Sequence, residues 1–200
     1  MVNMTSPIEQ ILKGRHLYLA SASPRRRQLM SNLGYEVRLI EPREVDESFP
    51  TGMPVDDAPV YISRKKAEAY CDVITPDMIV VTADTVVIAD NKLLGKPHSP
   101  EDAVKMLETL SGKRHRVITG VTLTTFDKIH SFKTVTEVDF DTLTTQEIAY
   151  YIDEFKPFDK AGAYGIQEWI GYVGIRGISG DYYNVMGLPV HDLYKHLCQI

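Results

Sequence analysis

The chain has 200 residues, of which 44% are hydrophobic and 24% charged, and its formal net charge is −5. This length fits one domain of ordinary size, or one domain split into two lobes. This net charge argues against a general nucleic-acid-binding surface, which would need a basic face, and no segment approaches the ~20 apolar residues of a membrane span. Two distant cysteines without a ligand pattern, and a start without an export signal, favour the reducing cytoplasm.

The first predicted helix has an unusual start. An apolar run over 16–20 indicates a strand, and Ser23 with the following proline is typical of the beginning of a helix over 23–33. The arginines at 25–27 then fall in the first turn, where the helix dipole disfavours each exposed cation by about 0.3–1 kcal/mol. This pattern indicates a site that receives an anion such as phosphate, and a solvated basic turn is the alternative.

Strand and helix patterns alternate through the first half of the chain. A polar loop over 41–57 lies among them. The expected elements are a strand over 35–40, a helix over 58–72, a buried strand over 78–81, a hairpin joining 85–89 to 92–94, and a helix over 99–110.

The second half has longer strand patterns. Two β-type runs, 116–126 and 129–140, are joined by a short turn and predict an antiparallel hairpin. A capping box at Thr144 opens a helix, and a last helix starts near Pro189. Between them, a strand is expected over 169–178. We therefore expect a mixed α/β fold with long antiparallel strands, in one domain with two lobes.

Carboxylates and lysines at special positions are candidates for chemistry. Asp84 follows the buried strand, a common place for a metal ligand or general base, although a simple turn residue is the alternative. Glu47 belongs to an acidic run that by itself indicates a solvated loop. Lys66 lies on the predicted 58–72 helix, and Lys96 stands between glycine and proline, which fix its backbone.

Other motifs narrow the chemistry. The glycine-rich stretch over 158–167 indicates an irregular functional loop, and Gln167 offers the donor and acceptor needed to read a nucleobase edge, although a surface glutamine is the common alternative. The chain has no GxxxxGK[ST] or GxGxxG motif, which excludes P-loop and dinucleotide-binding chemistry. Six histidines are scattered without metal-ligand spacing.

Together these segments resemble the Maf family of nucleoside triphosphate pyrophosphatases, and the match runs from about Leu17 to Leu193. The motifs that carry it include Ser-Ala-Ser-Pro-Arg-Arg from Ser21, Glu47, Lys66-Ala67, Ala-Asp-Thr-Val-Val from Ala83, Gly-Lys-Pro from Gly95, Asp-Lys-Ala-Gly-Ala-Tyr-Gly-Ile-Gln from Asp159, and Asn-Val-Met-Gly-Leu-Pro from Asn184.

The resemblance implies a fold and a reaction. The fold is an elongated mixed sheet with flanking helices and two lobes around a cleft, similar to inosine triphosphate pyrophosphatases and often homodimeric. Residues 15–200 would form this single domain, and 1–14 an N-terminal extension without an assigned function. The reaction is hydrolysis of a nucleoside triphosphate between the α and β phosphates, to a monophosphate and pyrophosphate, with Mg²⁺ or Mn²⁺.

The resemblance also assigns roles to residues. Asp84 would be the general base and, with Glu47, a metal ligand. The residues expected to bind phosphate are Ser21, Ser23, Arg26, Lys66 and Lys96. The residues at the positions typical of the branch that hydrolyses dTTP and UTP are Arg25, Thr85 and Gln167.

Two alternatives stay open at this stage. The sister branch of the family hydrolyses 7-methylguanosine triphosphate, and the family is also associated with arrest of cell division, so the chain could act as a nucleotide-sensing regulator. Glu168 follows Gln167 where the family commonly has glycine, and we expect it to narrow the base pocket.

Overall fold

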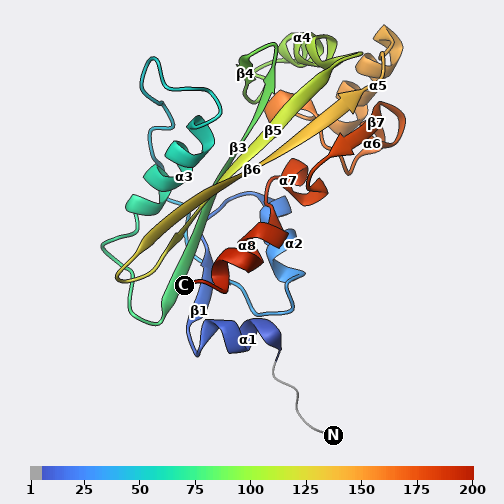
Figure 1. The fold of residues 1–200 in the computed structure, drawn as a ribbon. Helices are drawn as coiled ribbons and strands as arrows, with labels where there is room; N and C mark the ends of the chain where they lie inside the picture. The colour runs from blue at the N-terminus through green and yellow to red at the C-terminus, as the bar shows by residue number, and fades with distance from the viewer. Residues whose placement is uncertain (1–5) are drawn as a thin grey trace, which may run out of the picture.

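The computed structural model describes residues 6–200 and contains a seven-stranded mixed sheet flanked by helices (Figure 1). The strands are β1 (His16–Leu19), β2 (Arg38–Leu39), β3 (Met78–Ala89), β4 (Lys92–Leu94), β5 (Arg114–Thr124), β6 (Ile129–Phe140) and β7 (Ile175–Ser179). Their order is β2-β1-β3-β5-β6-β7, and β4 pairs with β3. β1 is parallel to β2 and β3, and the other pairs are antiparallel, which confirms the predicted α/β class.

Helices cover both faces of this sheet. They are α1 (Pro7–Leu12), α2 (Pro24–Ser31), α3 (Ala58–Glu68), α4 (Pro100–Leu110), α5 (Thr145–Phe155), a 3₁₀ turn η1 (Ala161–Ala163), α6 (Trp169–Val173), α7 (Tyr182–Met186) and α8 (Val190–Leu197). The start of α3 presses so closely on β5 that a side chain at Gly120 would overlap the backbone of Pro59. In Figure 1, α3 lies on one side of the long strands, and α2, α7 and α8 lie on the other.

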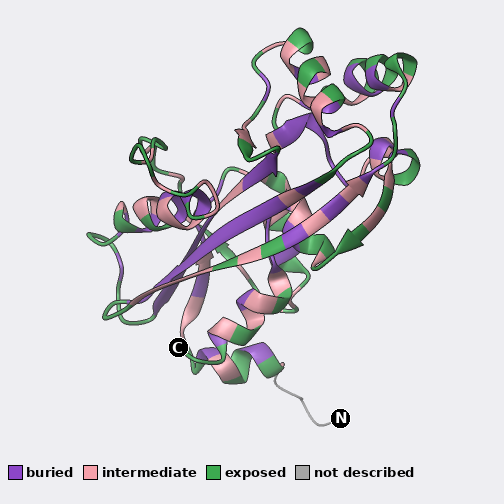
Figure 2. Cartoon of the chain, turned by 45° about the horizontal axis from the view of Figure 1, so that its top comes forward, coloured by how far each residue is buried: buried purple, intermediate pink, exposed green. Residues whose placement is uncertain are grey.

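The core has two large clusters at opposite ends of one sheet face. In β3, Ile79 and Val81 belong to the cluster that α1, α2 and α8 cover, whereas Val87 and Ala89 belong to the cluster under α4, α5 and α6. Buried residues run along β3 and β5 between the two clusters (Figure 2). These two packing units agree with the two lobes that we expected.

Short-range signals in the sequence are confirmed. Ser23 caps α2 by accepting a hydrogen bond from the backbone N–H of Arg26, and Thr144 opens α5 with a complete capping box. Asp90 and Asn91 both have positive φ in the two-residue turn of the β3–β4 hairpin, which matches the twist of the two strands.

Four predicted strands differ from the structure. The run over 35–40 forms only the two residues of β2, and the runs over 78–81 and 85–89 form one continuous strand, so Asp84 lies in the middle of β3 and not at a strand end. The polar residues between these runs suggested a break between two strands. Inside the sheet they find hydrogen-bond partners, since the Thr82 hydroxyl donates to the Ser63 carbonyl. The start of the predicted 169–178 strand is helix α6, since Gly171 packs directly on the Ile166 carbonyl.

Besides α6, two helices, α1 and α7, were not predicted. Ile8 and Leu12 of α1 are buried in the same cluster as Leu193 and Leu197 of α8. The proposed boundary between an extension over 1–14 and a domain over 15–200 stays a prediction. Among residues 6–200, no helix is long and apolar enough to cross a membrane.

Candidate active site

A gap along one edge of β3 creates the cleft of the molecule. β5 pairs with β3 along one edge, whereas on the other edge β1 pairs only with 78–81 and β4 only with 87–89. The segment 82–86 therefore has no strand neighbour on this second edge among the described residues. A cleft of about 600 Å³ lies here. Its walls come from the start of α2, the 42–49 loop, α3, the Gly95-Lys96 turn and the 159–167 loop.

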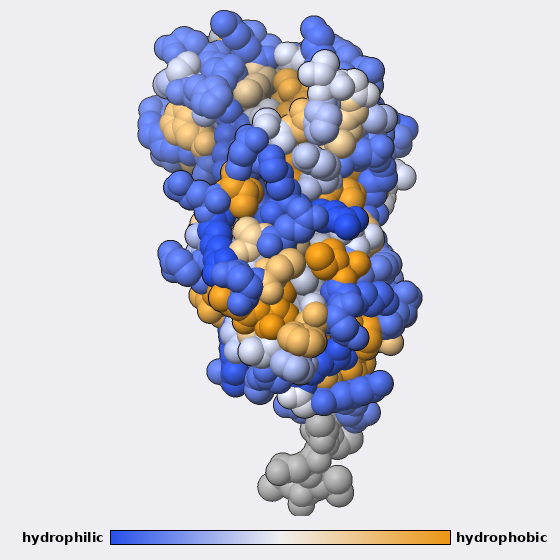
Figure 3. Space-filling model, turned by 90° about the vertical axis from the view of Figure 1, so that its left-hand side faces the viewer, coloured by the Kyte–Doolittle hydropathy of each residue, from blue (hydrophilic) through white to orange (hydrophobic). Residues whose placement is uncertain are grey.

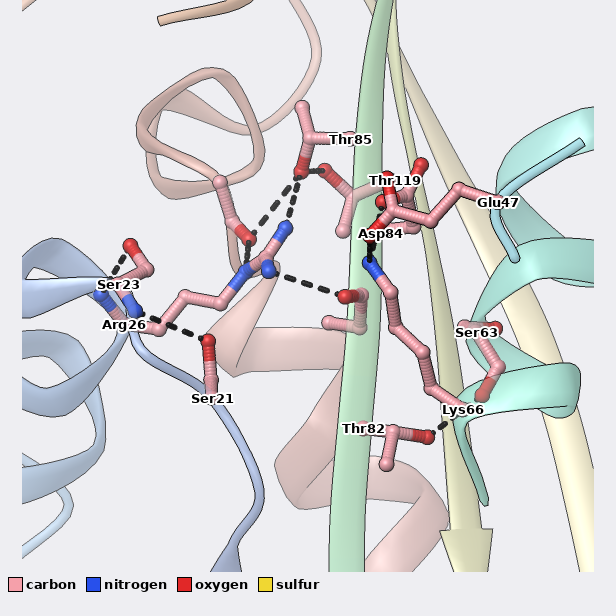
Figure 4. Close-up of polar contacts among 12 residues, drawn as sticks. Ser21, Ser23, Arg26, Glu47, Ser63, Lys66, Thr82, Asp84, Thr85 and Thr119 are labelled. Carbon is pink, nitrogen blue, oxygen red and sulfur yellow. Dashed lines mark hydrogen bonds and ion pairs between the residues drawn. The ribbon is translucent and has the colours of Figure 1, made fainter. Parts of the chain in front are cut away.

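Asp84, Lys66 and Glu47 form a charged centre on the α3 side of β3 (Figure 4). Lys66 Nζ lies 2.8 Å from Asp84 Oδ1 and 2.8 Å from Glu47 Oε1. Asp84 and Lys66 are mostly buried, but the Glu47 side chain is 59% exposed. The single ammonium group cannot balance two carboxylates, so the centre keeps one net negative charge. Among the described residues, none donates a hydrogen bond to Asp84 Oδ2.

The donor set at this centre fits a hard divalent cation. Mg²⁺ prefers oxygen ligands and is usually held by one or two carboxylates together with substrate phosphates, not by a cage of protein ligands. Asp84 and Glu47 supply two such carboxylates beside one amine. No group of three or more His, Cys, Asp or Glu side chains within residues 6–200 could hold a metal by itself. Asp84 and Glu47 could therefore hold such a cation only together with further oxygen ligands.

Arg26 fastens three elements together on the opposite face of β3. Its Nε donates to the carbonyl of Gly187 at 2.8 Å, and its two terminal nitrogens donate to Ala83 O at 2.9 Å and Thr85 Oγ1 at 3.0 Å. Burial lowers the pKa of Arg26, and the nearby Asp84 partly opposes this effect. The guanidinium still lines the cleft, but protein acceptors occupy three of its five N–H groups.

Thr85, which was predicted to select the substrate, accepts one of the hydrogen bonds of Arg26. Its hydroxyl lies 2.9 Å from Thr119 Oγ1 and 3.3 Å from the Gly187 carbonyl. Adjacent strand residues point to opposite faces, so Asp84 reaches the α3 side and Thr85 the α2 side. The two neighbours thereby take part in different contacts, although both line the same cleft.

The loop before α2 and the first arginine form another wall. Ser21 Oγ accepts from the backbone N–H of Ser23, and both serines line the cleft beside the N-terminus of α2. Arg25 donates to Asp159 Oδ2 at 2.7 Å. Burial raises the pKa of Asp159, but hydrogen bonds from Lys160 and Arg25 outweigh this and hold that pKa below its usual value.

Lys96 and Gln167 complete the predicted set. Both line the cleft, and Lys96 is exposed with no ion pair to a described residue. The side-chain carbonyl oxygen Oε1 of Gln167 is buried without a hydrogen-bond partner among the described residues. An unpaired buried acceptor is costly, so a donor that reached Gln167 Oε1 would stabilise this wall. All ten residues predicted for the site, Ser21, Ser23, Arg25, Arg26, Glu47, Lys66, Asp84, Thr85, Lys96 and Gln167, therefore lie around one cleft, and their individual roles stay predictions.

Sequence reasoning gave no role to Lys160 and a different one to Glu168, and the structure pairs these two residues. Lys160 is a buried ammonium group in the cleft, held by Asp159 and Glu168. Glu168 does not line the cleft, so the expectation that it narrows the base pocket is wrong. Its side chain turns behind the loop because it binds Lys160 and Tyr151. The only sequence signal was the position of Glu168 next to Gln167.

The outer surface near α3 is mixed in character. Figure 3 shows this side of the molecule, where patches of apolar side chains lie among mainly hydrophilic ones. Phe49 and Ile62 contribute apolar side chains to the lining of the cleft itself. The cleft therefore offers charged groups for phosphate and apolar groups for a flat ring.

Comparison with known proteins agrees with these observations. The model of the family described as Maf-like protein matches residues 16–200. A protein of Bacteroides thetaiotaomicron named dTTP/UTP pyrophosphatase is 52% identical over 90% of this chain and 94% of its own length. A protein of Parabacteroides distasonis with the same name is 49% identical over 93% and 96%, respectively.

Among solved structures, a nucleoside-triphosphatase / dITP/XTP pyrophosphatase from Mycobacterium abscessus is similar over 64% of this chain and 75% of that one. Its identity is 13% and its TM-score 0.40, a likeness too low to support an argument. The assignment rests on the family model and on the relatives at about half identity. The chain belongs to the family of Maf-like proteins.

Proposed function

We propose that this protein is a nucleoside triphosphate pyrophosphatase that hydrolyses dTTP and UTP to the monophosphate and pyrophosphate. The observation that carries the proposal is the Asp84–Lys66–Glu47 centre, which lies in one cleft with the N-terminus of α2. The names of relatives that are 43–52% identical over at least 90% of this chain support it.

Each group of cleft residues has its own role in the proposed reaction. Water attacks the α-phosphorus, the bond from that phosphorus to the oxygen bridging to the β-phosphate breaks, and pyrophosphate leaves. Asp84 Oδ2, which no described residue occupies, accepts the proton of the water as general base. Lys66 and Lys96 offset the charge of the triphosphate, and the N–H groups at the start of α2 donate to its oxygens.

A divalent cation completes this proposal. Asp84 and Glu47 would hold Mg²⁺ or Mn²⁺ together with oxygens of the substrate, and the cation would neutralise charge that develops on the phosphates. The net negative charge of the Asp84–Lys66–Glu47 centre supports this role, because an additional cation balances it.

Base selection is proposed for the opposite wall of the cleft. Uracil and thymine present an N–H donor beside a carbonyl acceptor, which complements the two ends of an amide. Gln167 has such an amide, and its Oε1 is unpaired among the described residues. Arg25 and Thr85 would assist this choice from the α2 side.

The test is pyrophosphate release from a panel of pyrimidine, purine and 7-methylguanosine triphosphates, with Mg²⁺ or Mn²⁺ and with a chelator. We expect turnover of dTTP and UTP that depends on the cation. Preference for 7-methylguanosine triphosphate would assign the chain to the sister activity. Nucleotide binding without turnover on any substrate would instead favour a nucleotide-sensing regulator.

The cellular setting is part of the same proposal. A reducing cytoplasm suits Cys71 and Cys198, which are both exposed and unpaired. We also propose a homodimer that binds neither a membrane nor a nucleic-acid polymer. Light scattering behind size-exclusion chromatography tests the dimer, and a monomer at micromolar concentration would contradict it.

A further inference from the structure

The 159–168 loop contains a chain of ionic and hydrogen-bonded contacts that starts and ends at the cleft. Arg25 binds Asp159, Asp159 binds Lys160 at 2.8 Å, and Lys160 binds Glu168 Oε1 at 2.9 Å. The second oxygen of Glu168 accepts the hydroxyl proton of Tyr151. That hydroxyl in turn accepts the backbone N–H of Gly165, two residues before Gln167, at 3.0 Å.

Glu168 is the central member of this chain of contacts. The Lys160 side chain is only 9% exposed, and a buried ammonium group is costly unless it is paired. Asp159 is 57% exposed and is shared with Arg25, so the more buried Glu168 is the main counter-charge of Lys160. The four charges balance, and Asp159 stays free to hold Arg25.

The same carboxylate packs against the turn that carries Gln167. A Cβ atom placed on Gly165 would lie 2.9 Å from Glu168 Cδ, 3.0 Å from Lys160 Cε and 3.1 Å from Gln167 Nε2. Three side chains therefore meet around one glycine. The Glu168 backbone N–H also donates to the Gly165 carbonyl at 3.0 Å, which closes the turn.

We propose that Glu168 is a positioning residue for nucleotide selection, which fixes the Gly165–Gln167 turn and neutralises Lys160 so that the Gln167 amide is held toward the cleft. This inference rests on the proposed function. It concerns a position where the family resemblance leads one to expect glycine. Glu168 would affect substrate choice through Gln167, since Glu168 itself does not line the cleft.

An amide at position 168 cannot replace the carboxylate. Glu168 accepts hydrogen bonds from both Lys160 and Tyr151, one on each oxygen, whereas glutamine has one acceptor end and one donor end. The Glu168→Gln variant keeps the shape but loses the charge that balances Lys160, and with the amide oxygen on Lys160 the Tyr151 hydroxyl no longer has an acceptor for its proton. Tyr151→Phe removes the hydroxyl link to Gly165 and leaves the Lys160–Glu168 pair intact.

The experiment measures kcat and KM for UTP and for a purine nucleoside triphosphate. For Glu168→Gln we expect the ratio of kcat/KM for UTP to that for the purine to fall about fivefold, mainly through a higher KM for UTP, because one positioned hydrogen bond is worth about that factor. Tyr151→Phe should lower the ratio in the same direction. Glu147→Gln is the matched control, since Glu147 belongs to the capping box of α5 and does not line the cleft.

A double-variant cycle tests whether Glu168 acts through Gln167. In the Gln167→Ala background, Glu168→Gln should change the ratio no further. An unchanged ratio in both Glu168→Gln and Tyr151→Phe, or an equal effect of Glu168→Gln in both backgrounds, would overturn the inference. If Glu168→Gln does not fold, Tyr151→Phe decides the question. Absence of turnover in the unmodified protein would instead overturn the proposed function, and calorimetric binding of UTP would then show whether selection survives.

Discussion

The cationic residues on the two faces of β3 have different kinds of hydrogen-bond partner. On the α3 face, Lys66 is held by two carboxylates whose charges it cannot fully balance. On the other face, Arg26 is held by two backbone carbonyls and a hydroxyl, all of which belong to the folded framework. Both residues were predicted to bind phosphate from the sequence. The structure places Lys66 in the charged Asp84–Lys66–Glu47 centre, whereas Arg26 links α2, β3 and the end of α7.

The difference follows from the kind of partner. A lysine can exchange its carboxylate contacts for phosphate with little change in the backbone, because it is a flexible point charge. The carboxylates that it releases are then free to bind another cation. A guanidinium bound to carbonyls at fixed positions is part of the packing, and its loss leaves acceptors unpaired. A substitution on one face should therefore change kinetics, and a substitution on the other should change stability as well.

The largest effect is expected at the reactive centre. Asp84→Asn removes the proposed general base while it keeps the shape, so kcat for UTP should fall by roughly 10²–10⁴. The melting temperature serves as the control and should stay close to that of the unmodified protein. Turnover close to normal in a folded Asp84→Asn variant would show that Asp84 is not the base.

A pair of variants tests the contrast between the two faces directly. Arg26→Lys keeps the charge but cannot reach three acceptors, so the free energy of unfolding should fall by about 1–3 kcal/mol. Lys66→Gln should lower kcat/KM by about tenfold or more with a smaller loss of stability, because Lys66 carries charge at the centre. Chemical denaturation and pyrophosphate release measure the two effects. Equal stability losses in both variants would remove the distinction.

The dependence of stability on pH is expected to come from a histidine outside the Asp84–Lys66–Glu47 centre. His115 is buried and bonded to Tyr164, and burial lowers its pKa from 6.5 to about 4, although Asp139 partly opposes this. Between these values the unfolded chain binds more protons than the folded one, so stability falls as the pH falls from 6.5 toward 4. The loss should reach about 3 kcal/mol.

Denaturation at several pH values measures this slope. His115→Gln should flatten it, and the residual pH dependence of activity in that variant would belong to the centre and substrate. A slope that is the same with and without His115 would show that another group controls acid stability.

The smallest effect is expected in substrate choice. Gln167→Ala should lower discrimination between pyrimidine and purine nucleotides by about five- to tenfold, with less effect on kcat, because a neutral hydrogen bond contributes about 1 kcal/mol. Ratios of kcat/KM across the nucleotide panel check this. If activity falls equally on every nucleotide, Gln167 supports the wall and does not read the base.

Local signals in the sequence predicted much of the framework. The cap at Ser23, the capping box at Thr144 and the β5–β6 hairpin depend on residues a few positions apart, and all three are confirmed. The strand expected over 169–178 was half wrong because β-type residues there form α6, where Gly171 packs on the Ile166 backbone. Such a close approach depends on the fold around it, not on local preference.

The sequence by itself determined which residue types meet at the site and how α2 begins, since caps, turns and motif resemblance are short-range properties. Only the tertiary structure decided the partners of each charge. Arg25 binds Asp159 and Arg26 binds Gly187, which lie 134 and 161 residues away along the chain. A long cationic side chain binds whichever acceptors the folded backbone and loops leave without a partner. Which acceptors these are depends on how distant strands and loops pack, so local sequence cannot predict them.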